Sequence, residues 1–252
     1  MKVAWCTPLE IDDPASVASL LGATALAESF EVRVFSTSRA AQLATKLPTM
    51  ALEPAERFDG FDHVVFNYGN DLDLFGPIHQ AALTRPGVIV LRSLMLHRLF
   101  AGLWLKADAN PDRYVERMAA WYGYPGALAA AEVNLGTRFP VGDDPEASAK
   151  FPLWQEALAG AEAVVIHDPS LSAEIREEWD GPLIEIPDPA RIDSRVFADE
   201  MLGAFRAAKR WRPWLALSNR VGLELAGLGT VQPLPVMARA ASEIENMRRQ
   251  LQ

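Results

Sequence analysis

Short apolar runs separated by amphipathic segments set the pattern of the chain. Six runs are too short for a core helix and rich in β-branched or aromatic residues, which predicts strands buried on both faces. They read "KVAWC", "EVRVFS", "HVVFNYG", "GVIVLRS", "EAVVIHD" and "PLIEIP". Residues 16–29, 74–84 and 171–179 lie between them and carry apolar residues at helical spacing. This alternation predicts an α/β fold, with a Rossmann-like parallel sheet and helices on both of its faces.

Two regions depart from this alternation. Residues 99–158 predict a helical insert of two or three helices, with the polar stretch "FPVGDDPEAS" as an exposed hinge or lid. From residue 194 onward the pattern is helical to the end, with breaks expected at "RWRP" and "GLGTVQPLP". We therefore expect a Rossmann-like domain over residues 1–190 and a helical tail over residues 191–252 that packs on it.

Composition narrows the possible partners and the compartment. The net charge is −9, and 24 basic residues are scattered among 33 acidic ones without a basic tract, which argues against nucleic-acid binding. The single cysteine, Cys6, lies inside the first apolar run, so an intramolecular disulfide is excluded and a reducing compartment is favoured. With no signal peptide and no transmembrane segment in the pattern, we expect a cytoplasmic protein.

The turn after the first predicted strand is unusual for this fold. Nucleotide-binding proteins place glycines there, because glycine lets backbone N–H groups close on a phosphate. This turn reads "TPLEIDDPAS" and has no glycine; it carries Glu10, Asp12 and Asp13, and Pro14 lacks an N–H group. The turn is therefore expected to repel a nucleotide, and we expect no cofactor.

Several stretches resemble the acceptor-side domain of glycosyltransferase family 4, the retaining enzymes of the GT-B fold. The run "FDHVVFNYGNDLDLFGPIHQAALTRPGVIVLRSLMLHRLF" has the family's strand ending in Gly-Asn, then a helix, "RPGV" and a strand. "YVERMAAWYG" and "ALAGAEAVVIHDPSLSAEIREE" are similar to later elements of that domain. The resemblance covers the chain from Met1 to about Pro189 and implies a role in glycan or polysaccharide biosynthesis.

The tail sharpens this resemblance. "FADEMLGAFRAAKRWRPWLALSNRVGLELAGLG" is similar to helices that follow the donor-binding domain in such transferases, yet here it comes within about ten residues of the last predicted strand. By this resemblance, the donor-binding domain is missing between Pro189 and Arg195. Where the family often reads Leu-His-Asp, this chain reads Leu91, Arg92 and Ser93, and arginine cannot act as a base. The resemblance thus implies a non-catalytic or partner-dependent relative.

What remains is an acceptor-side cleft. In an open parallel sheet the ligand crevice lies beyond the carboxyl ends of the strands. Polar residues at these ends are candidates to bind a saccharide or a partner protein. Such residues often do no more than form hydrogen bonds with polar groups of the backbone and the loops. We predict no catalytic residue and no metal ligand. The predicted cleft residues are Thr7, Glu10, Tyr68, Gly69, Asn70, Arg92, Ser93, His97, His167, Asp168 and Asp188.

Four further features have plain structural interpretations. "DLD", residues 71–73, imitates a metal-binding motif but is expected to supply charge at a helix N-terminus. His63 is expected at the surface. Two placements are open for His97, facing the crevice or packing in the core, and packing is slightly favoured. The aromatic residues of the insert are expected to form core or to line an acceptor site; they are Trp104, Trp121, Tyr122 and Tyr124.

Three functions are consistent with this pattern. The first is a transferase relative completed by a full-length glycosyltransferase or a donor-binding subunit. The second is a free-standing module that binds a saccharide or a protein. The third is a small hydrolase that acts through His167 and Asp168, which is disfavoured because no nucleophile with an adjacent base is visible. Loss of the donor domain would expose surface, so a homo-oligomer is also expected.

Overall fold

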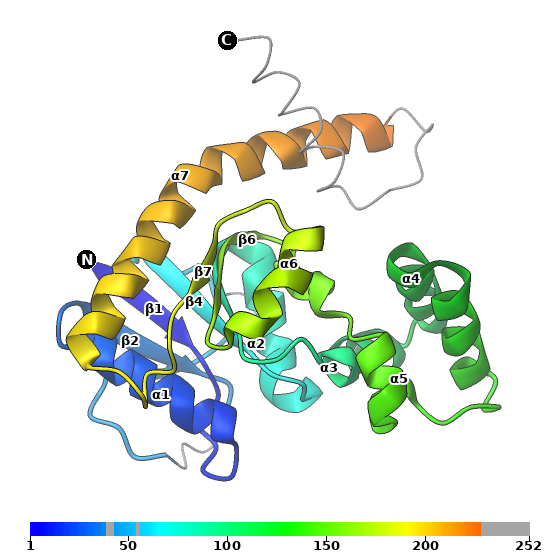
Figure 1. The fold of residues 1–252 in the computed structure, drawn as a ribbon, viewed down its shortest axis with the longest axis horizontal. Helices are drawn as coiled ribbons and strands as arrows, with labels where there is room; N and C mark the ends of the chain where they lie inside the picture. The colour runs from blue at the N-terminus through cyan, green and yellow to red at the C-terminus, as the bar shows by residue number, and fades with distance from the viewer. Residues whose placement is uncertain (39–42, 54–55, 228–252) are drawn as a thin grey trace.

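One parallel sheet organises the molecule (Figure 1). The computed structural model describes residues 1–38, 43–53 and 56–227, with side chains up to residue 212. The strand order is β3-β2-β1-β4-β5-β6-β7, and every neighbouring pair is parallel. This confirms the predicted α/β, Rossmann-like sheet. The strands are β1 (Lys2–Cys6), β2 (Glu31–Ser36), β3 (Thr49–Ala51), β4 (His63–Tyr68), β5 (Gly87–Leu91), β6 (Ala161–Ile166) and β7 (Leu183–Glu185).

The structure contains the six predicted strands and one that the apolar pattern missed. Strand β3 has only three residues, pairs with β2 at the edge of the sheet, and is exposed along its whole length. Because an exposed edge strand buries neither face, it leaves no apolar run in the sequence. A search for buried strands therefore did not find β3.

Helices cover both faces of the sheet, as predicted. Along β4, Val64 and Phe66 face one apolar core while Val65, between them, faces the other. Helices α2 (Leu72–Thr84) and α6 (Ser172–Glu178) cover the first face together with the insert. Helices α1 (Pro14–Ala27) and α7 (Ser194–Gly227) cover the second. Because both faces are buried, most strands read as continuous apolar runs.

The insert projects to one side of the sheet (Figure 1). It comprises α3 (His97–Gly102), the π-helical turn η1 (Leu103–Ala107), α4 (Pro111–Asn134), the 3₁₀ turn η2 (Val141–Asp143), α5 (Pro145–Lys150) and the 3₁₀ turn η3 (Trp154–Leu158). A further 3₁₀ turn, η4 (Pro169–Leu171), follows β6. Part of the predicted lid folds into η2 and α5, and Val141 in it is fully buried in the core.

Helix α4 is a helical hairpin. Its backbone breaks at Gly123, whose φ of 63° lies in the region that favours glycine. The two arms run back along each other, so that the Asn134 side chain at the far end donates to the Pro111 carbonyl at the start, at 3.0 Å. The hairpin thus closes on itself and forms the outer part of the insert.

Helix α7 crosses the sheet as a single element. The predicted break at "RWRP" is wrong, because the backbone stays helical from Ser194 to Gly227. Two contacts hold the chain there: Trp211 packs on Trp179, and Arg212 forms two hydrogen bonds with Glu162, which is buried in β6. The part of the predicted helical tail that follows Gly227 lies outside the described residues. Of the helices that are described, none is both long enough and apolar enough to cross a membrane.

Two glycines make a matched test of this packing. A Cβ at Gly87, the first residue of β5, would lie 2.6 Å from the Val64 carbonyl oxygen, whereas a Cβ at Gly203 in α7 meets nothing within 4 Å. We expect Gly87→Ala to lower the free energy of unfolding by about 1–3 kcal/mol, because backbone must move. Gly203→Ala should raise it by up to about 1 kcal/mol, because alanine favours the helix. Urea unfolding measures both; equal effects would contradict the packing described.

Candidate functional site

The first turn is closed by its own side chains. Thr7 is fully buried, and its backbone N–H donates to the Phe35 carbonyl at 3.0 Å. Asp13 caps α1: its carboxylate accepts from the Ser16 N–H at 2.8 Å and from the Ser16 hydroxyl at 2.6 Å. Pro14 has no N–H to offer, and Glu10 is half-buried nearby. The N–H groups that bind phosphate in nucleotide folds are thus already occupied.

The end of β4 connects the sheet to the insert. The Tyr68 side chain is buried, and its hydroxyl bonds Nδ1 of His79 at 3.0 Å. Gly69 lies against the Phe75 ring, where a Cβ would approach to 2.5 Å. The Asn70 side-chain oxygen accepts from the Leu99 N–H in α3 at 3.3 Å. Of the three residues predicted here, Asn70 is among those that line the cavity described below, and Tyr68 and Gly69 are not.

Three predicted residues from three strand ends meet in what we call the edge cluster: Arg92, His167 and Asp188. Arg92 follows β5, and its Nη1 donates to Asp188 at 3.3 Å. His167 follows β6, and its Nδ1 is 2.8 Å from the Ile186 carbonyl oxygen. A carbonyl only accepts, so Nδ1 carries the proton and Nε2 keeps its lone pair. The sheet therefore places a guanidinium and an imidazole acceptor at neighbouring strand ends.

Burial and neighbouring charges set the protonation of the edge cluster. Burial lowers the pKa of His167, and the Arg92 charge lowers it further, while the Ile186 hydrogen bond opposes the shift. Burial likewise lowers the pKa of Arg92, against the attraction of Asp188. For Asp188, burial acts upward, but the Ala190 N–H and the Arg92 charge prevail and lower its pKa. The cluster therefore holds a neutral imidazole, a cation and an anion at neutral pH.

The remaining predicted edge residues, Ser93 and Asp168, form hydrogen bonds within their own loops. Ser93 is exposed and accepts from the Met95 N–H at 3.0 Å. Asp168 is exposed and accepts from the Ser170 N–H at 2.9 Å, and the hydrogen bonds from Ser170 lower its pKa. The hydrogen bonds of the described residues do not include one between His167 and Asp168. The geometry thus gives no support to a hydrolase that uses this pair.

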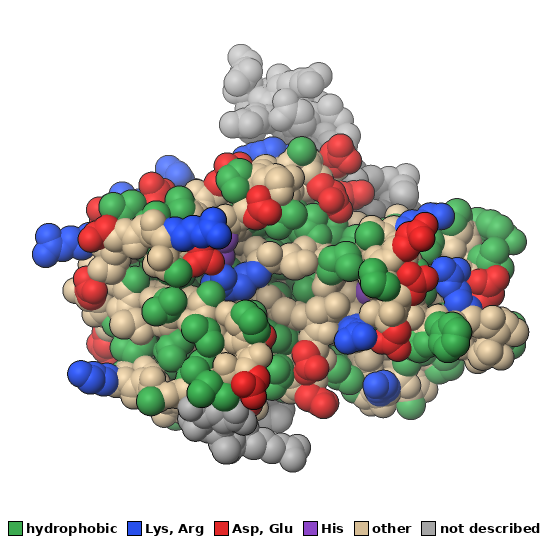
Figure 2. Space-filling view, turned by 60° about the horizontal axis from the view of Figure 1, so that its bottom comes forward, with side chains coloured by type: hydrophobic (Ala, Val, Ile, Leu, Met, Phe, Trp, Pro, Cys, Tyr) green, Lys and Arg blue, Asp and Glu red, His purple; other side chains and the backbone are tan. Residues whose placement is uncertain are grey.

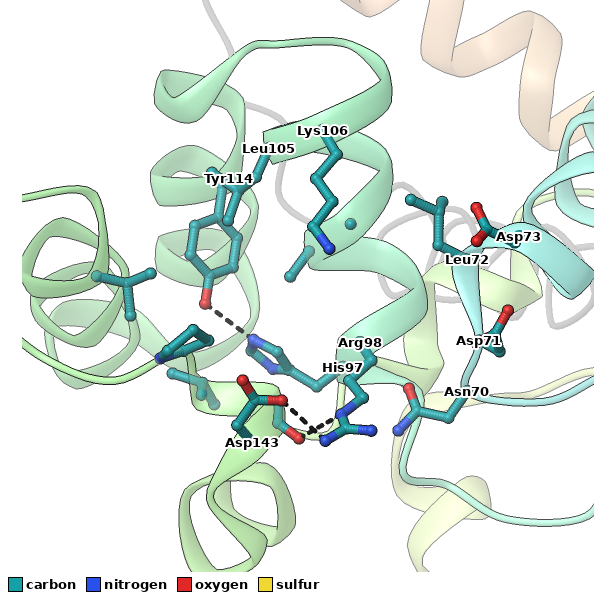
Figure 3. A pocket seen from close by; sticks show the side chains of 16 residues that line it. Asn70, Asp71, Leu72, Asp73, His97, Arg98, Leu105, Lys106, Tyr114 and Asp143 are labelled. Atoms are coloured by element: carbon teal, nitrogen blue, oxygen red, sulfur yellow. Dashed lines mark hydrogen bonds and ion pairs between the residues drawn. The ribbon is translucent and has the colours of Figure 1, made fainter. Parts of the chain in front are cut away.

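A cavity of about 600 Å³ opens where the end of β4 meets the insert. We call it the insert cavity; Figure 3 shows its walls. Asn70 and Asp71 come from the loop after β4, His97 and Arg98 from α3, and Leu105 and Lys106 from η1. Tyr114 of α4 and the η2 residues Val141 to Asp143 line the opposite side. The other lining residues are Leu72, Asp73, Ala101, Gly102, Val133 and Pro140. Its size and mixed apolar and polar lining suit a small organic ligand.

His97 forms a fixed part of the wall of this cavity. Its Nδ1 donates to the Phe151 carbonyl at 2.5 Å, and its Nε2 accepts from the Tyr114 hydroxyl at 2.8 Å (Figure 3). The residue is fully buried, and burial lowers the pKa of the imidazole to about 4. With both ring nitrogens occupied, His97 positions Tyr114 and the chain at Phe151 rather than offering a reactive group.

Ion pairs and caps shape the mouth of the cavity. Arg98 donates to the Gly142 carbonyl at 2.9 Å and to Asp143 at 2.8 Å, which ties η2 to α3 (Figure 3). Asp71 caps α2 by accepting from the Leu74 N–H at 2.9 Å, and Asp73 lies in the first turn of that helix. The "DLD" motif thus supplies charge at a helix N-terminus. Among the residues described, no cluster of three potential metal ligands is found.

The aromatic residues of the insert mostly build its interior. Trp104 is buried and packs on Phe100 and Tyr114. Trp121 is half-buried and donates to Glu156 at 2.5 Å. The Tyr122 hydroxyl accepts from the Leu153 N–H at 2.7 Å, whereas Tyr124 is 76% exposed at the tip of the hairpin. These four residues do not line the insert cavity.

Three polar residues lie outside the sequence-based prediction or differ from it. Asn67, inside β4, donates to the Cys6 carbonyl at 3.1 Å, and its buried side-chain oxygen has no partner among the described residues. The sequence held a signal for this buried polar group, because Asn67 interrupts an otherwise apolar predicted strand. Lys106 points into the insert cavity (Figure 3), but the neighbouring sequence gave no indication that this lysine lines a cavity. His63, expected at the surface, is instead half-buried and stacks on Phe205 at 4.5 Å between ring centroids.

Comparisons of the chain with protein-family models, with curated protein sequences and with solved structures give no match. The function is therefore inferred from the geometry of the insert cavity and the edge cluster.

The histidines predict how stability depends on pH. Burial lowers the pKa of His63, His79 and His97 to about 4 each, below the usual value near 6.5. The unfolded chain therefore binds more protons between these values, and stability is lost as pH falls from about 6.5 towards 4. We expect His97→Gln to reduce the slope of unfolding free energy between pH 6.5 and 5 by up to about 1.4 kcal/mol per pH unit. Urea unfolding across this range, where few carboxylates titrate, measures it. An unchanged slope would contradict the burial of His97.

Proposed function

We propose that this chain is the acceptor-side half of a glycosyltransferase-type protein. It binds a saccharide in the insert cavity and takes part in glycosyl transfer only together with a donor-binding partner. The observation that carries this proposal is the insert cavity itself, which opens beside the carboxyl end of β4. Ligands of open parallel sheets bind at this edge.

The lining of the cavity supports a saccharide rather than an apolar ligand. Asn70 and Lys106 bring an amide and an ammonium group to the wall, while Leu105 and Val141 supply apolar surface. Sugars present hydroxyl groups at their rims and C–H groups on their faces, and a mixed wall matches both. The five charged lining residues nearly balance, with Asp71, Asp73 and Asp143 against Arg98 and Lys106. A neutral polyol therefore fits better than a strongly charged ligand.

The first turn supports a module that does not hold a nucleotide alone. The N–H groups at the start of α1 donate to the Asp13 carboxylate, and Glu10 and Asp12 add negative charge nearby. A diphosphate placed there would displace a cap and face like charges. The chain also runs from β7 into α7 through residues 186–193 alone, so no domain stands between these elements.

The surface supports a protein or saccharide partner over a nucleic acid. On the face shown in Figure 2, basic and acidic side chains are interspersed, and hydrophobic side chains lie between them. No basic stripe crosses this face. A polyanion would need such a stripe for its backbone charges.

Filling the cavity tests the saccharide site. Ala101 lines the cavity, whereas Ala120 is exposed on α4 and outside it. We expect calorimetry to detect binding of at least one of glucose, galactose, mannose and N-acetylglucosamine to the parent protein. Ala101→Phe should weaken that binding at least about tenfold, because the new ring occupies the ligand's space, a loss of about 1.4 kcal/mol. Ala120→Phe should leave it unchanged. Thermal melts establish that both variants are folded.

Two results would overturn this assignment. One is that none of the four sugars binds. The other is that Ala101→Phe, while folded, binds as the parent protein does.

Nucleotides test the role of the first turn. We expect nucleoside diphosphates and their sugar conjugates to bind the isolated chain no more tightly than about 1 mM, near −4 kcal/mol. The isolated chain should also transfer no glycosyl group from them. Asp13→Asn with Asp12→Asn should strengthen nucleotide binding only modestly, because Pro14 still offers no donor. Micromolar binding to the parent protein, measured by calorimetry, would contradict the account of this turn.

A further inference from the structure

Three consecutive strand ends form a row along the carboxyl edge of the sheet. Tyr68 pairs with Leu91 across β4 and β5, and Leu91 pairs with Ile166 across β5 and β6. Arg92 and His167 directly follow the paired residues Leu91 and Ile166. Asn70 comes two residues after Tyr68. The row therefore runs from Asn70, on the wall of the insert cavity, past Arg92 to His167.

The far end of this row carries groups that the fold does not use fully. His167 is half-buried and gives Nδ1 to Ile186, which leaves the Nε2 lone pair without a hydrogen bond among the described residues. Arg92 gives Nη1 to Asp188, and its Nε is buried and closed to a ligand. The side chain is nevertheless 17% exposed, and its Nη2 has no hydrogen bond among the described residues. A donor and an acceptor thus stand at adjacent strand ends. A hydroxyl group is complementary to both, because its oxygen accepts from arginine and its hydrogen donates to imidazole.

Charge excludes the most obvious competing ligand. Arg92 is the only cation of the edge cluster, and it is paired with Asp188. Asp13, the cap of α1, also acts on the charge of Arg92. An anion would therefore meet the negative charges of two carboxylates around a single guanidinium. A neutral hydroxyl meets no such opposition.

We infer that Arg92 and His167 form a second subsite, which binds a hydroxyl group of an oligosaccharide whose other end occupies the insert cavity. This inference rests on the proposed saccharide site, and it specifies that the ligand of that site is longer than one sugar ring. Neighbouring strands are about 4.8 Å apart, so the row from the end of β4 to that of β6 spans at least about 10 Å. A single sugar ring in the cavity does not reach His167. A disaccharide or trisaccharide passing over the strand ends does.

Oligosaccharide length is the variable that tests the second subsite. Calorimetry compares glucose with maltose and maltotriose, and galactose, mannose and N-acetylglucosamine with their disaccharides and trisaccharides. We expect the longer member of the series that binds to bind about tenfold more tightly than its monosaccharide, because it gains hydrogen bonds to Arg92 and His167. His167→Asn retains an N–H for the Ile186 carbonyl and removes the Nε2 acceptor. It should abolish this gain and leave monosaccharide binding unchanged.

His63→Asn is the matched control. His63 is also half-buried, but it begins β4 at the opposite edge of the sheet, and its substitution should leave the gain with length intact. Imidazole ¹⁵N spectra give a second readout: His167 should be the neutral Nδ1–H form at pH 7. Its Nε2 resonance should shift with the longer saccharide and not with the monosaccharide.

The outcomes separate this inference from the proposed function. The second subsite is overturned if affinity does not rise with length, if the rise survives His167→Asn, or if Nε2 carries the proton. If monosaccharide binding is insensitive to Ala101→Phe, the cavity assignment fails instead. Absence of binding by every saccharide of the panel overturns both.

Discussion

The parallel register of β4, β5 and β6 is the constraint on which the rest of the structure depends. Because all seven strands run in one direction, the residues that follow them gather at one edge. The pairing of Tyr68 with Leu91, and of Leu91 with Ile166, brings Asn70, Arg92 and His167 into one row. These three residues are far apart in the sequence. Their proximity is a product of the backbone hydrogen bonds of the sheet.

The start of α1 shows how one cap changes the chemistry of a fold. In nucleotide-binding sheets, free N–H groups and a helix N-terminus attract phosphate to the first turn. Here the Asp13 carboxylate accepts from Ala15 and Ser16, and Pro14 removes a donor. The same features that stabilise the helix also repel an anion. The insert cavity lies elsewhere, between the loop after β4 and the insert.

Buried polar contacts fix the insert against the sheet. His97 links α3 to the chain at Phe151 and to Tyr114, and Glu156 receives hydrogen bonds from Arg117 and Trp121 of α4. Each contact joins segments that are at least 17 residues apart in the chain. Buried groups of this kind are costly when unpaired, so they specify one arrangement of the helices. The cavity owes its shape to that arrangement, since its walls come from both the sheet loops and the insert.

The sequence alone determined the fold class, since an apolar run buried on both faces has a local signature that any reader of the chain can find. It also indicated the acidic first turn and the strand ends where Arg92, His167 and Asp188 lie. It missed β3, which is exposed, and it broke α7 at Pro213, where contacts with Trp179 and Glu162 outweigh the local signal. Only the tertiary structure decided that Tyr68 points into the core and that Lys106 lines a cavity. The reason is physical: periodicity encodes which face of an element is buried, whereas the partner of a polar side chain depends on segments far away in the chain.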